Sequence, residues 1–272
     1  MPTIDMSEPW LRLLAFASVF VVMAVLEVLA PRRLLTAGKS RRWTTNLAIV
    51  GLGGLLVRVL AVLPVPLAAV AAAAYAERHG LGLVPWLGIS GWPVVLGGLV
   101  VLDFAIWLQH VASHRLGVLW RLHQVHHADI DFDVTTAIRF HPIEIGLSML
   151  WKIAWVLALG VPAGVVLAFE IILNGCAMFN HANVTLPIWL DRLLRTVVVT
   201  PDMHRVHHSV DPGEHHRNFG FNLSIWDRLF ATYVAQPAAG HEAMTIGLPQ
   251  YQSKAPTELG WSLLLPFWSR GR

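Results

Sequence analysis

The chain has 272 residues, of which 55% are hydrophobic and only 14% are charged, with a mean hydropathy of +0.56. Soluble domains carry about 25% charged residues and could not bury so much apolar surface, so the composition excludes a soluble protein and indicates one membrane domain. A net charge of +3 argues against nucleic-acid binding, and the single cysteine, Cys176, excludes a disulfide framework and a cysteine-based metal site.

The first predicted element is a transmembrane helix over residues 10–30, which is almost wholly apolar. About 20 residues at ~1.5 Å each span the ~30 Å hydrocarbon core of a bilayer. The first nine residues lack a positive segment, so we expect no cleavable targeting peptide. A basic cluster follows the helix at once and predicts that this loop is cytoplasmic. Its members are Arg32, Arg33, Lys39, Arg41 and Arg42.

Two further spans are predicted before the first histidine pair. The apolar stretch 47–75 contains Pro64 and Pro66, which predict a kink or a broken helix. Arg58 within it is costly in lipid and is expected to snorkel or to face protein. The third span covers residues 92–108. Three crossings from a non-cytoplasmic N-terminus return the chain to the cytoplasm.

The next apolar block, residues 143–178, is too long for one helix and contains a Gly-Val-Pro break at 160–162. We expect a helical hairpin that enters the membrane and returns to the same side. The apolar residues 263–268 are too few to cross and predict an interfacial patch. The chain then divides into N-terminal transmembrane helices (1–91), a catalytic domain (92–235) and a C-terminal tail (236–272).

Histidine spacing is the main functional signal, since twelve of the 14 histidines lie between positions 110 and 216. One H-x-x-x-H pair is followed by two H-x-x-H-H groups that start 81 residues apart, and these spacings bring side chains to one helical face. The eight residues are His110, His114, His123, His126, His127, His204, His207 and His208. His181, after the hairpin, is a ninth candidate.

So many imidazoles predict two metal ions, because a structural zinc takes four ligands and a catalytic zinc three. Imidazole suits zinc, copper, iron and nickel alike, so the ligand type does not name the metal. His79 and His241 stand alone and are expected to be surface or satisfied core residues. A ligand role stays open for His141, His215 and His216, with support of the ligands favoured for His141.

Three carboxylates are candidates to orient the histidines. Asp103 lies two helical turns before His110, and an acid inside a span is a functional candidate, although a polar contact with Arg58 is an alternative. Asp202 and Asp227 are the other two. Glu170, Asn174 and His181 form a polar stripe on the second arm of the hairpin, which would point at the metals or cap a lipid pocket.

The order of these motifs resembles the fatty acid hydroxylase / sterol desaturase superfamily of integral-membrane di-iron oxygenases. The resemblance covers residues 103–233 and includes L-W-R-L-H-Q-V-H-H at 119–127, R-F-H-P at 139–142, N-F-G at 218–220 and W-D-R-L-F at 226–230. Ala231 departs from the glycine that the family often has there. The resemblance implies an all-α, polytopic membrane protein whose cytoplasmic, histidine-rich helical cap holds two metal ions.

The same resemblance implies two iron ions, O₂ and a lipid substrate such as a fatty acyl chain or a sterol- or isoprenoid-like lipid. Hydroxylation and desaturation both stay open. The sequence carries no nucleotide or flavin motif, so electrons are expected from a separate donor protein. The alternative is a membrane metal-binding or metal-transport protein, which would place its histidines near the middle of the spans. A cytochrome ranks last, because haem needs axial histidines on opposed helices.

Overall fold

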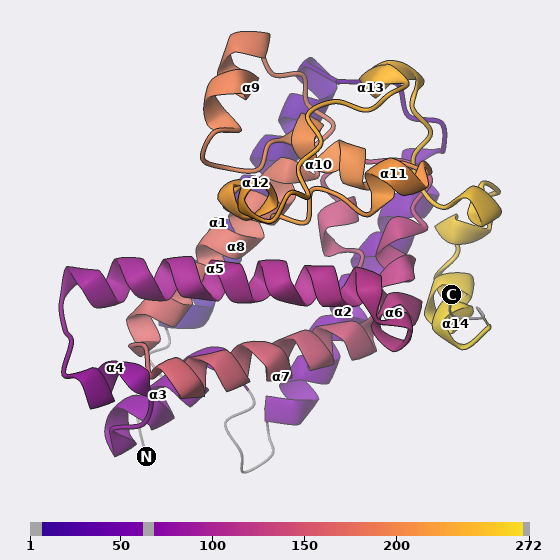
Figure 1. Ribbon diagram of the computed structural model, residues 1–272. Helices are drawn as coiled ribbons and strands as arrows, with labels where there is room; N and C mark the ends of the chain where they lie inside the picture. Colours follow the sequence, from indigo (N-terminus) through magenta and orange to yellow (C-terminus); the bar gives the residue numbers. More distant parts are fainter. Residues whose placement is uncertain (1–6, 62–67, 269–272) are drawn as a thin grey trace.

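The computed structural model describes residues 7–61 and 68–268 and is built of helices, with isolated bridges but no strand in this part of the chain (Figure 1). The helices are α1 (Ser7–Leu29), α2 (Lys39–Ala61), α3 (Ala69–His79), α4 (Leu83–Leu87), α5 (Trp92–Arg115), α6 (Gly117–His127), α7 (Pro142–Leu159), α8 (Ala163–Asn180), α9 (Ile188–Leu194), α10 (Pro201–His207), α11 (Pro212–His215), α12 (Ile225–Leu229), α13 (Gly240–Ala243) and α14 (Leu259–Trp268). Three 3₁₀ turns lie at Thr136–Ile138, Pro249–Tyr251 and Ala255–Thr257.

Four of these helices, α1, α5, α7 and α8, are long and apolar enough to cross a membrane, which makes this an integral membrane protein. The predicted stretch 47–75 is divided between two helices, in line with the expected kink or break, and neither helix is among the four candidate spans found in the described residues. The reason is local: α2 begins in the basic cluster at Lys39, and α3 has only 11 residues. Pro64 and Pro66 themselves lie outside the described residues.

The long helices share two opposed directions. α1, α5 and α8 run toward the end that carries the histidines, whereas α2, α3 and α7 run away from it. The predicted hairpin is present, and Gly160 ends α7 in the left-handed conformation, at φ 68°. A Cβ on Gly82 would lie 2.3 Å from the Gly160 backbone nitrogen, so the two loops at this far end meet only through glycine.

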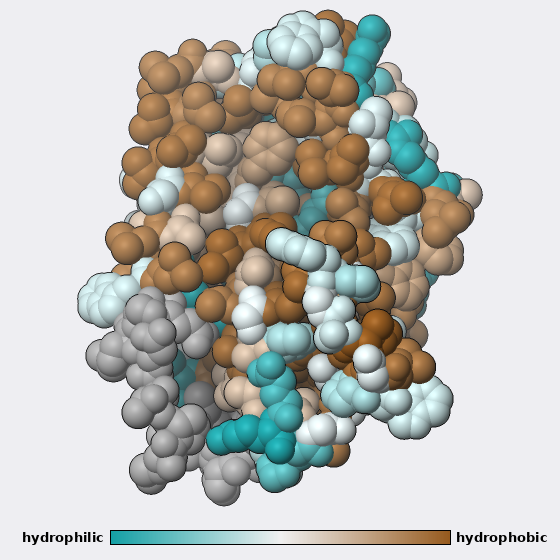
Figure 2. All heavy atoms as spheres, turned by 90° about the vertical axis from the view of Figure 1, so that its left-hand side faces the viewer, coloured by the Kyte–Doolittle hydropathy of each residue, from teal (hydrophilic) through white to brown (hydrophobic). Residues whose placement is uncertain are grey.

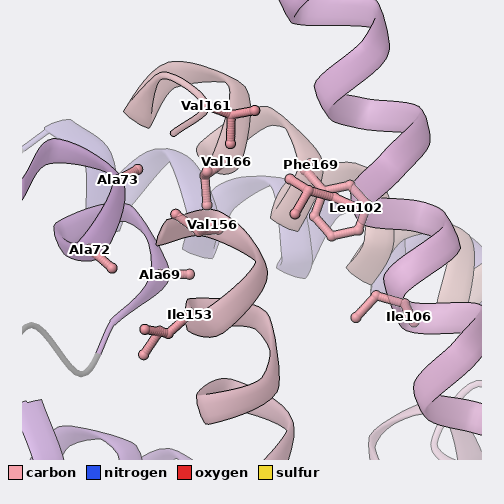
Figure 3. Packing of buried hydrophobic residues seen from close by; sticks show 10 residues of the cluster. All are labelled: Ala69, Ala72, Ala73, Leu102, Ile106, Ile153, Val156, Val161, Val166 and Phe169. Carbon is pink, nitrogen blue, oxygen red and sulfur yellow. The ribbon is translucent and has the colours of Figure 1, made fainter. Parts of the chain in front are cut away.

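An apolar core closes the far end of the bundle (Figure 3). Small side chains on α3, among them Ala69, Ala72 and Ala73, let this helix approach α7 and α8 closely. Figure 3 shows Ala69 beside Ile153 of α7, whereas Phe169 of α8 lies beside Leu102 of α5, and all four are buried. The packing therefore fixes the spacing of the helices whose opposite ends carry the histidines.

The histidine end is covered by α6 and by the short helices α9 to α13, which gather on one side of α5 (Figure 1). α2 is tied to this cap by charge, since Arg42 is fully buried and lies 2.7 Å from both Asp129 and Asp133. Burial alone would raise the pKa of Asp129, but Arg42 lowers it to about 2. Arg42, a member of the basic cluster that predicts a cytoplasmic loop, thus also binds α2 to the cap.

Large apolar side chains remain exposed over much of the surface, and Figure 2 shows one face on which they predominate. They cover α1 and continue onto the cap, where α9 exposes Trp189 and α12 exposes Leu229. The short α14 packs on α2 and α6, buries Leu265 and exposes Phe267 and Trp268. Exposed apolar surface of this extent is typical of a protein in contact with lipid.

Candidate metal centre

Helix geometry and helix ends position the histidines. α5 carries His110 and His114 one turn apart, and α6 carries the first H-x-x-H-H group in its last two turns. α10 carries the second group and starts at a defined point, because the Thr200 side chain accepts a hydrogen bond from the Met203 backbone and Pro201 follows it. His181 is the residue that ends α8.

The structure brings all nine predicted histidines together, in two adjacent groups that we call the histidine centre. Within each group, one ring nitrogen per residue lies within 4.8 Å of all the others, and every residue is buried. The first group is His110, His114, His123, His127 and His207, and the second group is His126, His181, His204 and His208.

Each H-x-x-H-H motif contributes to both groups. In α6, His123 and His127 belong to the first group and His126 to the second. In α10 the pattern is reversed, since His204 and His208 belong to the second group and His207 to the first. At 100° per residue, positions i and i+4 differ by only about 40° around a helix, whereas i+3 lies about 100° from i+4. The spacing therefore directs side chains to two neighbouring sites.

The distances between ring nitrogens fit metal coordination. In the first group, the Nε2 atom of His127 lies 3.1 Å from that of His114 and 3.2 Å from that of His123. Two nitrogens that each bind one ion at about 2.1 Å lie about 3 Å apart, so this spacing suits a shared ion.

The second group has the same spacing. The Nε2 atom of His181 lies 3.2 Å from that of His126 and 3.1 Å from that of His204. Burial, with a smaller effect of neighbouring imidazoles, lowers the pKa of His126 and His204 far below the usual value, and burial lowers the pKa of His181 to about 3. These rings are therefore neutral at pH 7, which is the form that binds metals.

Hydrogen bonds at Nδ1 leave Nε2 to face the centre. The His110 and His207 rings bond through Nδ1 to the carbonyl oxygens of Phe219 and Arg217, at 2.7 and 2.6 Å. Their buried Nε2 atoms have no hydrogen-bond partner among the described residues, as expected for nitrogens that would bind a metal. His123 bonds through Nδ1 to the carboxylate of Glu144 at 2.6 Å.

Asp103 does not have the expected position. Its carboxylate accepts hydrogen bonds from the Trp226 indole at 2.7 Å and the Leu223 backbone at 3.2 Å, and none of its described hydrogen bonds involves His110 or Arg58. His110 already donates to a backbone carbonyl, so the helical register of Asp103 brings it instead to the cap loop packed against α5.

The other two carboxylates differ from each other. Asp227 accepts from the backbone nitrogens of Phe219 and Gly220, both at 2.8 Å, and so positions the segment whose carbonyl holds His110. Asp202 was a candidate to orient a histidine ligand, but it pairs with Arg205, Arg32 and His241. Asp202 therefore ties the loop after α1 to α10.

The remaining histidines have separate environments. His141 caps α7, where its Nδ1 accepts from the Ile143 backbone, and it is not part of either group. His215 and His216 lie beside the first group, next to His114, and form with it a third arrangement that could hold an ion. His79 is exposed, whereas His241 is buried against Asp202.

Sequence reasoning missed Glu144 and the buried acids that follow α6. Glu144 stands three residues after His141 in the family motif region, and an acid inside an apolar span was the available signal. The acids Asp129, Asp131 and Asp133 form a D-x-D-x-D pattern directly after the first H-x-x-H-H group, and all three are buried. The signal there was the concentration of charge in a chain with little charge.

A cavity of about 350 Å³ reaches the histidine centre from within the long helices. His110 and His123 line one end, and apolar side chains such as Ile106, Phe140 and Met149 line the walls. Glu170 and Asn174 also line this cavity, whereas His181 belongs to the second histidine group, so the polar stripe borders both the pocket and the histidine centre. A cavity of this size and lining suits an apolar chain with a few polar groups.

Comparison with known proteins agrees with this geometry. The family model described as fatty acid hydroxylase matches residues 95–232, just over half of the chain, and this region holds all nine histidines. Alkylglycerol monooxygenase of Xenopus tropicalis is 30% identical over 159 residues, which is 56% of this chain and 31% of that protein.

Two more relatives agree. Ornithine lipid hydroxylase OlsE of Rhizobium tropici is 33% identical over 153 residues, which is 54% of this chain and 44% of that protein. Human alkylglycerol monooxygenase is 27% identical over 201 residues, or 71% of this chain and 41% of the relative. Each match spans less than half of the relative's length, and no solved structure matches the chain. Because the family model matches more than half of the chain and the matched region holds all nine histidines, the chain belongs to the fatty acid hydroxylase family.

Proposed function

We propose that this protein is an O₂-dependent, non-haem di-iron membrane oxidoreductase that hydroxylates a C–H bond of a lipid. The observation that carries the proposal is the pair of buried histidine groups at the end of an apolar cavity. Imidazole nitrogen alone would suit several metals, but the relatives are named as monooxygenases and hydroxylases, and this chemistry favours iron over zinc. Two bound iron ions would supply the electron transfer to O₂ that oxidation of a C–H bond needs.

The protein's own residues would hold the ions, exclude water and position the substrate. The Nδ1 bonds of His110, His123 and His207 would fix their rings with Nε2 toward the ions. The Phe140 ring stacks on His126 with a centroid distance of 4.3 Å and, as a wall of the cavity, would shield the centre from water. An alkyl chain in the cavity would present a C–H bond beside His110 and His123.

We further propose that the catalytic unit is residues 92–235 and that the histidine centre faces the cytoplasm. The basic loop after α1 lies at the same end of the helices as both H-x-x-H-H groups, and such loops stay on the cytoplasmic side. Substrate would enter from the bilayer, and electrons would come from a separate electron-transfer protein. Hydroxylation is favoured over desaturation because the names of the compared relatives describe insertion of oxygen.

The test combines metal analysis with isotope labelling. Full-length protein produced with iron should contain about two iron atoms per chain, and cells that express it should incorporate ¹⁸O from ¹⁸O₂ into a lipid. The double variant His126→Ala/His207→Ala should do neither. One tightly held zinc with full activity would overturn the iron assignment. Metal uptake into cells without any oxidised lipid would favour the transport alternative, although histidines gathered at one end of the spans argue against it.

A further inference from the structure

Within the four candidate spans, Pro9–Leu29 of α1 and the whole of α5, α7 and α8, charged side chains are few, and most have a structural partner. Glu27 accepts hydrogen bonds from backbone nitrogens of the cap, Asp103 bonds to Trp226, Glu144 bonds to His123, and Arg115 ends α5. The remaining three, Arg12, Lys152 and Glu170, come from α1, α7 and α8 and meet on the wall of the cavity. Ionisable groups at such a place are expensive and mark function by default.

These three residues, which we call the charged cluster, are tightly arranged. Lys152 Nζ lies 2.6 Å from one carboxylate oxygen of Glu170, and Arg12 Nη1 lies 2.6 Å from the other. The carboxylate therefore has a cation on each oxygen. The Lys152 ammonium has three donors, of which one bonds to Glu170, and its side chain is 11% exposed. Arg12 makes at least one interaction in addition to its ion pair with Glu170.

The charged cluster lies at a defined distance from the histidine centre. On α7, Glu144, Ser148 and Lys152 follow at four-residue intervals, and the first of them holds the ligand His123. Eight residues of helix cover ~12 Å, so Lys152 stands about that far from the ligand end along the cavity. Ser148 donates to Gln109, and apolar side chains form the rest of the wall between the two ends.

We propose that the cavity takes a lipid with an anionic oxygen group, a carboxylate or a phosphate ester, which binds Lys152 and Arg12 while its alkyl chain extends to the histidine centre. This inference rests on the proposed function and names the substrate class of the same site. The anion would accept charge-assisted hydrogen bonds from both cations, whereas a neutral lipid would offer the Lys152 ammonium no second charged acceptor beside Glu170. The cluster would thereby select the substrate and set which carbon lies at the metals.

The experiment measures binding without turnover. Iron-loaded, full-length protein in detergent, without reductant, is equilibrated with radiolabelled palmitate, hexadecyl phosphate or hexadecanol. Wild type should bind both anions more tightly than the alcohol. Lys152→Met should weaken palmitate binding by about tenfold and leave hexadecanol binding unchanged, as loss of one charge-assisted bond implies. Glu170→Gln should strengthen palmitate binding, because it removes the carboxylate that competes with the ligand.

The control is Arg58→Met, since Arg58 is an exposed cation on α2 that does not line the cavity. This variant should bind all three probes as wild type does. Equal losses for palmitate and hexadecanol in both cluster variants would show a purely structural ion cluster and overturn the inference, as would a wild type without preference for anions. Because no turnover is measured, a protein that prefers anions but never oxidises a lipid would refute the proposed function alone.

Discussion

The histidine centre and the charged cluster are built in opposite ways. All nine histidines of the centre lie within residues 110–208, and most of them belong to short repeated spacings on three helices. The charged cluster joins residues that are far apart, since Arg12 and Glu170 are separated by 158 positions. Local spacing therefore specifies the histidine centre, whereas the groups proposed to select the substrate depend on how distant helices pack.

The largest effect is expected at the centre itself. His126→Ala and His207→Ala each remove one nitrogen from a different group, and both should lose iron and reduce lipid oxidation by more than about a hundredfold, beyond the loss typical of a supporting residue. Iron content and ¹⁸O incorporation at matched expression measure this. The exposed His79→Ala should behave as wild type. If His126→Ala kept its full iron content, the assignment of the second group would be wrong.

The next effect tests what supports the centre, through two adjacent arginines. Arg42→Met leaves the buried Asp129 and Asp133 without their cation and should lower the free energy of unfolding by about 3–5 kcal/mol. Arg41→Met removes an exposed ion pair in which Arg41 Nη1 lies 3.6 Å from Glu258 Oε1, and it should lower the free energy of unfolding by less than about 1 kcal/mol. Thermal unfolding in detergent compares them, and similar losses would contradict the role assigned to the buried pairs.

Glu144→Gln tests the carboxylate that holds His123 at the place where the cavity meets the histidine centre. The variant keeps the shape of the side chain but removes the charge that holds His123, so iron affinity or turnover should fall about 10–100-fold. Iron content after dialysis against a chelator is the direct measurement. Glu258→Gln, an exposed acid on the surface, is the matched control. Unchanged iron retention in Glu144→Gln would remove this residue from the support of the centre.

Asp103→Asn should have a smaller effect, and this effect should be on stability. Its position two turns before His110 had predicted an effect on the metal centre instead. The substitution weakens the bonds to Trp226 and Leu223 and should lower the free energy of unfolding by about 1 kcal/mol. Iron content should not change, because His110 is held by Phe219. A loss of iron without a loss of stability would restore the direct link to His110.

The smallest expected effect is a difference in stability between variants of two isolated histidines, His241 and His79. Burial lowers the pKa of His241 to about 4, so this ring is neutral at pH 7 and packs against Asp202. His241→Ala should therefore cost about 1 kcal/mol of stability, more than the ~0.5 kcal/mol limit typical of surface positions such as His79. Both variants should keep their iron. If the two variants were equally stable, the buried packing of His241 would make no contribution to the free energy of unfolding.

Particular residues show how far the sequence alone could predict the protein. The sequence alone identified the helical fold, the spans at 10–30 and 92–108, the hairpin at Gly160 and all nine histidines that converge. It predicted a break within 47–75 but not the ends of α2 and α3, because the average hydropathy of a segment does not reveal where a helix starts or stops. It also assumed that Asp103 orients His110, because residues seven apart share a helical face, although a neighbouring loop can supply the partner first.

Properties that depend on short spacing could be read from the residues alone: apolar length, the glycine turn, and the i, i+3, i+4 positions that bring each H-x-x-H-H motif to one helical face. The packing of the helices was needed to show which histidines share a group, which carbonyl or carboxylate holds each ring, and that Lys152 and Glu170 line the cavity. The physical reason is range. Helix periodicity acts over a few residues, whereas contacts such as that of Arg42 with Asp129 are fixed by the simultaneous packing of segments that the chain order keeps apart.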